Sequence, residues 1–224
     1  NIFKMFETLI SKLQEDKYLT LETTPQHEPS MHNIVEKIKK FKIDSKVDGF
    51  TCTDNPLAKL KYNSLFAALK LQQELKKPVI ATMTMRDRNK IALQSDLLGA
   101  NDFDIRAILA LTGDPANMSD QPNSKGVFEA NSLMLLKMIK SFNYGMDFAG
   151  RPFKIEPKQI FPFAVVNAYA KNFGSLEKKM HLKIQNGAVG VITQPVFDIE
   201  NVKKLLENFE NAKENVEGDK KKAQ

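Results

Sequence analysis

Short apolar runs alternate with helical segments along the whole chain, and this alternation is the feature that most restricts the fold. Six runs have the length and composition of strands: residues 18–22, 47–53, 78–84, 107–112, 160–167 and 188–194. Most of them are continuously apolar, which is typical of strands that are covered on both faces. Strands that alternate with helices predict a parallel sheet with right-handed crossovers.

Apolar positions between these runs recur with a helical period. In three segments they are spaced by three or four residues: Met31, Ile34, Val35 and Ile38; Leu135, Ile139 and Phe142; Val202, Leu205, Leu206 and Phe209. We expect a helix in each segment. Ser30 is placed to cap the first of these helices and Asp198 the last. The polar residues 218–224 predict a solvated tail.

The expected strand ends are evenly spaced, with one exception. Consecutive ends lie 29, 31, 32, 53 and 27 residues apart, at Glu22, Thr51, Thr82, Asp114, Asn167 and Gln194. The interval of 53 residues contains a polar loop, 115–126, and a second segment rich in glycine and proline, 143–158. Long loops on the strand-end side commonly serve ligands.

Two architectures fit this alternation. A doubly wound nucleotide-binding sheet needs a glycine-rich turn after its first strand. Neither G-x-G-x-x-G nor G-x-x-x-x-G-K-[ST] occurs, and residues 22–25 (Glu-Thr-Thr-Pro) occupy that turn. A (β/α)8 TIM barrel needs no such turn and gathers polar residues from many strand ends around one axis. The sequence therefore favours a single TIM-barrel domain over residues 1–224. It holds about six βα units, so we expect two C-terminal strands and helices to be missing.

Composition excludes several classes of protein. The sequence has no apolar run near the roughly 20 residues of a membrane-spanning helix. The single cysteine, Cys52, rules out an internal disulfide and fits a reducing cytoplasm. We expect Cys52 to be a buried thiol rather than a nucleophile. The net charge of +6 comes from dispersed lysines and few arginines, which disfavours nucleic-acid binding and suits a small anionic substrate or cofactor.

Three polar residues are expected at strand ends, where loops after parallel strands face the ligand. Glu22 would project toward the barrel axis, where poor solvation favours a protonated general acid; a capping or salt-bridged glutamate is the alternative. Asp114 precedes Pro115 and is either a site carboxylate or a turn residue. Gln194 offers a ligand both hydrogen-bond donors and an acceptor. Lys183 is expected on the helix before the last strand.

Motifs for metal-dependent and serine hydrolases are missing. His27, Glu28 and His32 do not have H-E-x-x-H spacing, and Pro29 interrupts them. The nucleophile motif G-x-S-x-G does not occur. The sequence therefore predicts no protein-bound metal ion.

Four segments together resemble one enzyme family. They are residues 83–89 (Met-Thr-Met-Arg-Asp-Arg-Asn), 97–100 (Leu-Leu-Gly-Ala), 109–115 (Leu-Ala-Leu-Thr-Gly-Asp-Pro), and 187–198, which begins Gly-Ala and ends Ile-Thr-Gln-Pro-Val-Phe-Asp. In this order and spacing they closely resemble methylenetetrahydrofolate reductase. The resemblance covers nearly the whole chain.

This resemblance implies a flavin barrel that reduces 5,10-methylenetetrahydrofolate to 5-methyltetrahydrofolate. In that family FAD takes hydride from NADH or NADPH, which leaves before folate binds. By match of motif, Glu22 is the general acid that helps to open the bridging ring at N10, and Asp114 lies beside flavin and folate. Gln194 contacts folate. The other matched positions contact the flavin: Thr51, Thr82, Asn167 and Lys183.

The sequence departs from the family pattern in two places that bear on function. Residues 23–25 (Thr-Thr-Pro) replace an aromatic residue and prolines, and Thr82 stands where well-known members have a histidine. These departures, with the missing strands, motivate an alternative: a non-catalytic flavin- or folate-binding protein that acts through a partner subunit. A homo-oligomer is a further expectation. An unrelated barrel aldolase would need a Schiff-base lysine at a strand end, whereas Lys183 is expected on a helix.

Overall fold

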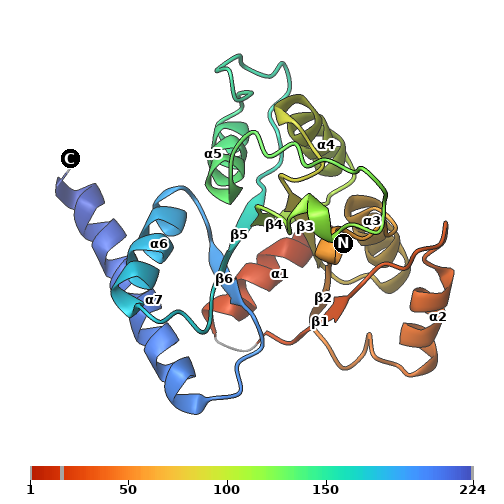
Figure 1. Ribbon diagram of the computed structural model, residues 1–224, viewed down its shortest axis with the longest axis horizontal. Helices are drawn as coiled ribbons and strands as arrows, with labels where there is room; N and C mark the ends of the chain where they lie inside the picture. The colour runs from red at the N-terminus through yellow and green to blue at the C-terminus, as the bar shows by residue number, and fades with distance from the viewer. Residues whose placement is uncertain (1, 16–17, 223–224) are drawn as a thin grey trace.

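The computed structural model describes residues 2–15 and 18–222 and contains a curled sheet of six parallel strands (Figure 1). The strands are β1 (Thr20–Thr23), β2 (Gly49–Cys52), β3 (Val79–Thr84), β4 (Ala107–Leu111), β5 (Phe161–Val166) and β6 (Gly190–Thr193). They lie in sequence order, each hydrogen-bonded to the next. A doubly wound sheet would reverse its strand order. The fold is therefore a partial (β/α)8 barrel, and all six predicted strands are confirmed.

The described residues also form seven α-helices and two short 3-10 helices. They are α1 (Ile2–Gln14), α2 (His32–Lys40), η1 (Pro56–Ala58), α3 (Ser64–Leu75), α4 (Lys90–Asp102), η2 (Ala116–Met118), α5 (Ser132–Asn143), α6 (Phe173–Gln185) and α7 (Ile199–Lys222). Helix α1 precedes β1, α7 follows β6, and the others lie between strands. An asparagine side chain accepts amide hydrogens at the start of each of four helices, α3 to α6: Asn63, Asn89, Asn131 and Asn172. Such caps satisfy amides that have no partner within the helix.

The start of α2 differs slightly from the prediction. The capping position is Met31 rather than Ser30, and α2 begins at His32. The Ser30 hydroxyl still accepts the His32 amide hydrogen at 3.0 Å. Ser30 therefore stabilises the turn before the helix without being its N-cap.

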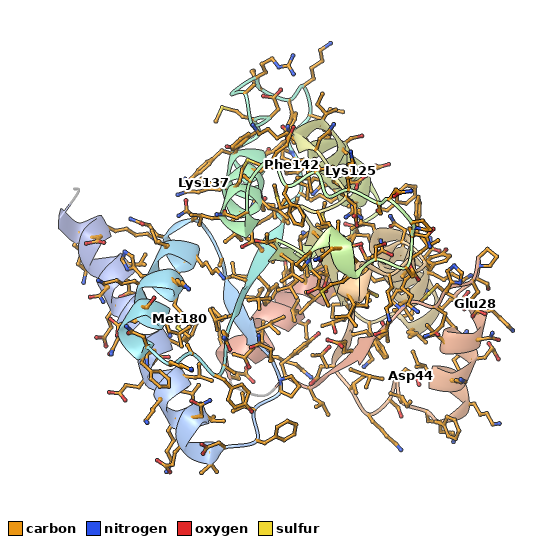
Figure 2. All side chains as sticks on the ribbon, viewed as in Figure 1. Glu28, Asp44, Lys125, Lys137, Phe142 and Met180 are labelled. Carbon is orange, nitrogen blue, oxygen red and sulfur yellow. The ribbon has the colours of Figure 1, made fainter. Side chains whose placement is uncertain are left out.

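The main core lies between the outer face of the sheet and helices α2 to α5. The predicted stripes supply buried residues from α2 (Val35, Ile38) and α5 (Leu135, Ile139, Phe142). Phe142, which is labelled on α5 in Figure 2, packs on the Phe153 ring at 5.1 Å between centroids. Outward-facing residues of the central strands complete this core, because alternate residues of a strand face opposite sides.

Helix α1 packs on the inner, concave face of the sheet, and no sequence pattern was assigned to it. Phe6 and Leu9 are fully buried against inward-facing residues of β3, β4 and β5, which include Ile80, Leu109 and Phe163. α1 therefore covers part of the surface that would otherwise line an open half-barrel.

Residues 219–221 are exposed, as predicted for a solvated tail, but residues 218–222 form the last turns of α7 rather than an irregular tail; residues 223 and 224 lie outside the described part of the chain. The apolar stripe of this helix continues beyond Phe209 to Ala212 and Val216, which are buried beside Met180 of α6 (Figure 2). Packing on α6 thus extends the helix through a strongly charged sequence. Leu206, predicted in this stripe, is mostly exposed.

The cap predicted for α7 is confirmed. The Asp198 side chain accepts the Glu200 amide hydrogen at 3.0 Å, and its carbonyl accepts that of Val202. Among the helices formed by residues 2–15 and 18–222, none has the length and hydropathy needed to span a bilayer.

Candidate functional site

A cavity of about 530 Å³ opens at the carboxyl ends of the strands. Residues from all six strands or the loops that follow them line it, as expected for the face of a barrel that carries ligand sites. Five of the residues predicted for the site lie here: Glu22, Thr82, Asp114, Lys183 and Gln194. Positions separated by up to 172 residues in sequence are thus brought together, since Glu22 and Gln194 share this cavity.

The wall of the cavity combines an apolar floor with hydroxyl groups. Leu109, Val165 and Ile192 line it from three neighbouring strands. Thr53 and Thr84 also line it, and each has a buried side-chain oxygen without a hydrogen-bond partner among the described residues. Buried polar atoms are normally paired. This wall therefore suits a flat apolar ligand with polar groups at its edges.

Glu22 lines the cavity from β1, but its side chain is exposed. The predicted poorly solvated environment is therefore wrong. The reason is the position of β1 at the edge of the described sheet, where it pairs only with β2. A strand with one neighbour shields its side chains less than a central strand does.

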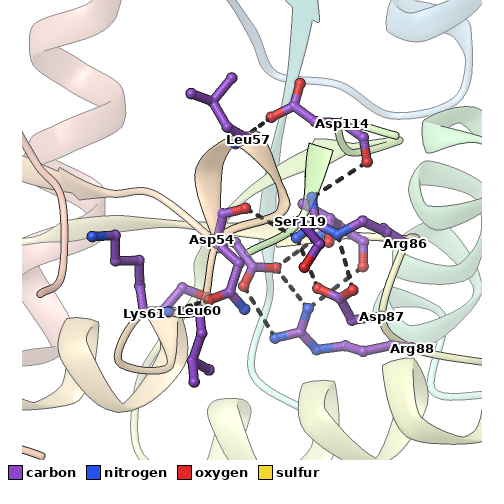
Figure 3. Close-up of polar contacts among 12 residues, drawn as sticks. Asp54, Leu57, Leu60, Lys61, Arg86, Asp87, Arg88, Asp114 and Ser119 are labelled. Atoms are coloured by element: carbon purple, nitrogen blue, oxygen red, sulfur yellow. Dashed lines mark hydrogen bonds and ion pairs between the residues drawn. The ribbon is translucent and has the colours of Figure 1, made fainter. Parts of the chain in front are cut away.

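Asp114 does more than terminate β4. Its Oδ2 accepts the Leu57 amide hydrogen at 2.6 Å, so the carboxylate holds the loop after β2 (Figure 3). Gly113 has a φ of +97°, and a Cβ atom there would lie 3.0 Å from Cβ of both Thr84 and Arg86. Glycine therefore allows the tight turn that carries Asp114 into the site.

The loop after β2 contains strained backbone. Asn55, Leu57 and Ala58 have φ values of 44°, 56° and 56°. A left-handed conformation costs roughly 1–2 kcal/mol for most residues other than glycine. Hydrogen bonds from neighbouring loops oppose this cost: Asp114 accepts from Leu57, and Arg86 Nη2 donates to the Asn55 carbonyl at 3.1 Å. Strain held in this way is common at functional sites.

The polar run 86–89 supports these loops. The guanidinium of Arg86 is buried and pairs with Asp87 at 2.8 Å, while it donates to the Asn55 carbonyl (Figure 3). Arg86 also lines the cavity. This network fixes the ends of β2, β3 and β4 relative to one another.

Arg88, two residues after Arg86, forms ion pairs of its own. Arg88 binds the buried carboxylate of Asp54 at 2.6 Å and the more exposed carboxylate of Asp96 at 2.8 Å. Burial is the largest single effect and lowers the pKa of Arg88, but the charges and hydrogen bonds of Asp54 and Asp96 together outweigh it, so the pKa is raised. Asp54 also accepts the Thr84 amide hydrogen at 2.9 Å. This pair connects the loop after β2 to β3 and α4.

Lys183 reaches the cavity from α6, as predicted. Its ammonium group donates to the Val165 carbonyl at the end of β5. Burial, together with the charge of Lys179, lowers its pKa. A half-buried cation beside the apolar floor can contact an anionic or carbonyl group of a ligand.

Two predicted flavin-contacting residues lie away from the main cavity. Thr51 is buried within β2, where its carbonyl accepts the Thr23 hydroxyl at 2.7 Å, and it does not line the cavity. Asn167 is exposed and lines an adjoining cavity, which shares Val165 and Lys183 with the main one. Its side chain accepts the Tyr169 amide hydrogen at 2.9 Å.

Thr53 and Thr84 were missed as site residues although the sequence contained a signal for them. They are the last residues of two predicted strands, 47–53 and 78–84, and both line the cavity. The family resemblance instead selected Thr51 and Thr82 as flavin-contacting residues, and each lies two positions earlier in the same predicted strand. Alternation places all four on the inner face, and the later pair lies closer to the cavity mouth.

A second cavity, of about 360 Å³, lies at the opposite ends of the strands and is lined by none of the predicted site residues. Within residues 2–15 and 18–222, no three or more His, Cys, Asp or Glu side chains are grouped as metal ligands.

Comparison with known families agrees with the architecture and the motifs. The family model described as methylenetetrahydrofolate reductase matches residues 6–217, nearly the whole chain. No curated protein matched the sequence.

Proposed function

Because this chain belongs to the methylenetetrahydrofolate reductase family, a group of oxidoreductases in folate metabolism, we propose that it reduces 5,10-methylenetetrahydrofolate to 5-methyltetrahydrofolate, with FAD as cofactor and NADH or NADPH as reductant. The observation that carries this proposal is the common cavity of Glu22, Asp114 and Gln194 at the carboxyl ends of the strands. These are the residues that the family motif pairs with acid, charge-stabilising and folate-binding roles.

The cavity wall is suited to FAD. The apolar floor of Leu109, Val165 and Ile192 would pack on a flat ring system, and the Thr53 and Thr84 hydroxyls would meet polar atoms at its edge. When bound, this cofactor supplies hydride transfer between nicotinamide and folate, while the protein supplies orientation and electrostatics. The cofactor would be held in the cavity by Thr82, Asp114 and Lys183. Two further residues would support it from outside this cavity: Thr51, buried in β2, and Asn167, in the adjoining cavity.

Asp114 and Glu22 have separate tasks in this scheme. Opening the bridging ring of the folate produces a cationic iminium, and the negative charge of Asp114 stabilises it as it forms. Glu22 donates the proton to N10 of the folate from the mouth of the cavity, where its exposed side chain can regain a proton from solvent. Gln194 orients the folate by hydrogen bonding. The nicotinamide binds and leaves before the folate, because both must approach the same face.

The test is an assay of the purified protein after it has been supplied with FAD. We expect a yellow protein that oxidises NADH or NADPH with an artificial electron acceptor. The same protein should oxidise 5-methyltetrahydrofolate in the reverse assay. A colourless protein that does not take up FAD would refute the proposal.

The exposed position of Glu22 on the edge strand favours a second candidate. A non-catalytic member would bind flavin or folate and act through a partner subunit that covers this edge. A flavin-loaded protein that is inert in both assays would support this candidate. Activity of the isolated protein would exclude it.

A further inference from the structure

Three hydrogen bonds join the loop after β5 to the loop after β6, and a fourth joins it to the start of α7. The Ala168 amide donates to Gln194 Oε1 at 2.9 Å, and the Asn201 side chain donates to the Ala168 carbonyl. The Tyr169 hydroxyl donates to the Pro195 carbonyl at 3.1 Å and accepts the Phe197 amide hydrogen at 3.2 Å. The hydrogen bonds from the neighbouring loop to the loop that carries Gln194 therefore come from two residues, Ala168 and Tyr169.

This arrangement determines which end of the Gln194 amide faces the cavity. Its oxygen is engaged by the Ala168 amide, whereas its nitrogen has no acceptor among the described residues. A primary amide has one acceptor oxygen and two N–H donors. Gln194 therefore presents donors, and its ligand must offer an acceptor such as a carbonyl oxygen or a ring nitrogen.

Apolar packing holds only the middle of this loop, where the partly buried Val196 contacts the cluster that contains Val166 and Ala168. Phe197 is 91% exposed and Tyr169 is 50% exposed, so neither ring is anchored in a core. The hydroxyl of Tyr169 is therefore the main polar link between Pro195–Phe197 and the segment that follows β5. Without it, the chain on the far side of Gln194 would keep only the packing of Val196 and the Asn201 hydrogen bond to Ala168, and the loop could shift.

We propose that Tyr169 is a positioning residue for folate: its hydroxyl holds the loop after β6 so that Gln194 directs its N–H donors at an acceptor atom of the substrate. This inference rests on the proposed function and assigns Gln194 the part of donor only. Tyr169 itself need not touch the substrate.

The first test replaces Tyr169 with phenylalanine, which removes the hydroxyl and keeps the ring. We expect the KM for methylenetetrahydrofolate to rise about tenfold, because a tenfold change corresponds to about 1.4 kcal/mol and the variant loses two hydrogen bonds. The kcat, the FAD content and the rate of flavin reduction by nicotinamide should change less than about twofold, since only folate binding depends on this loop. Tyr144→Phe is the matched control, because Tyr144 is 71% exposed and lies just after α5.

The second test uses Gln194→Glu, alone and combined with Tyr169→Phe. A glutamate keeps an oxygen for the Ala168 amide but loses both donors, so we expect a rise in folate KM of at least about tenfold. The folate KM of the double variant should be no higher than that of Gln194→Glu alone, because Tyr169 acts through Gln194.

Each outcome decides the inference. An unchanged KM in Tyr169→Phe, or a parallel loss of kcat and FAD content, would overturn it and leave the proposed function intact. If Tyr169→Phe does not fold, an unchanged KM in Gln194→Glu would overturn it instead. A wild-type protein that does not convert folate would overturn the proposed function, and this inference with it.

Discussion

At the scale of single residues, Asp114 combines a structural contact with a proposed chemical role. Its carboxylate accepts the Leu57 amide hydrogen and also lines the cavity. An asparagine at this position could still accept that hydrogen bond through its side-chain oxygen. Replacing Asp114 with asparagine therefore removes the charge while it keeps the loop.

We expect Asp114→Asn to slow folate reduction by about 100- to 1000-fold, the range seen when an electrostatic contact to a developing charge is removed. Flavin reduction by nicotinamide should be affected less. Stopped-flow measurement of the two half-reactions checks this. Asp120→Asn is the control, because Asp120 accepts the Leu60 amide hydrogen in the same loop without lining the cavity. Equal slowing of both half-reactions would argue against the proposed role of Asp114.

Cys52 is a structural thiol, as predicted. It is fully buried in the main core, and burial raises its pKa to about 12, against a smaller opposing effect of the Thr23 hydroxyl. The unfolded chain loses this proton near its ordinary pKa of 9.0, whereas the folded chain keeps it. The contribution of this thiol to stability is thus complete below pH 9 and is lost as the pH rises toward 12.

We expect wild type to lose about 1 kcal/mol of unfolding free energy per pH unit between pH 9 and pH 11, relative to Cys52→Ala, because one unit of pKa difference is worth about 1.4 kcal/mol. Urea unfolding of both proteins at several pH values measures this difference. Parallel pH profiles of the two proteins would contradict the assignment.

At the scale of secondary-structure elements, Arg88 connects three of them. It binds Asp54 after β2 and Asp96 in α4, and Asp54 in turn holds the Thr84 amide of β3. The side chain of Arg88 is only 10% exposed. Removing one member of a buried ion pair leaves the other charge without compensation.

We expect Arg88→Met to destabilise the protein by about 3–5 kcal/mol, the usual cost of breaking a buried ion pair. Arg151→Met is the matched control, because the pair of Arg151 with Asp147 has an arginine that is 82% exposed, and it should cost less than about 1 kcal/mol. Guanidinium unfolding of the two variants gives the comparison. Similar losses in both would show that burial does not strengthen the pair.

Elements with a strong periodic pattern were predictable, and those that depend on distant partners were not. The six strands follow from their apolar runs, and the buried stripe of α5 follows from its spacing. The end of α7 did not follow, because Ala212 and Val216 become apolar contacts only when α6 lies beside them. Leu206 fits the same apolar spacing, but it lies outside the cluster that α6 and α7 form, and its side chain is therefore exposed.

At the scale of the whole molecule, α1 covers the concave face of the sheet toward the amino-terminal ends of the strands (Figure 1). Phe6 is the centre of this contact: its ring lies 6.3 Å from that of Phe161, and the Arg106 guanidinium lies 4.9 Å from its centroid. An aromatic ring and a cation at this distance attract each other. The helix thus ties the N-terminal segment to three central strands.

We expect Phe6→Ala to destabilise the protein by about 3–5 kcal/mol, because it opens a cavity in a fully buried contact. Phe66→Ala, at a mostly exposed position of α3, should change stability by less than about 0.5 kcal/mol. Thermal or urea unfolding separates the two. A small effect of Phe6→Ala would mean that α1 is dispensable for the sheet.

The sequence by itself determined the six strands and the helical segments between them, the barrel class and the polar residues at the strand ends, because periodicity and turn chemistry are local properties of the chain. Only the tertiary structure decided how those residues are used. The exposure of Glu22 depends on β1 having a single neighbour, the contact of Asp114 with Leu57 depends on a loop 57 residues away, and the orientation of the Gln194 amide depends on Ala168. Such contacts join positions that are distant in sequence, and their geometry exists only once the sheet has curled.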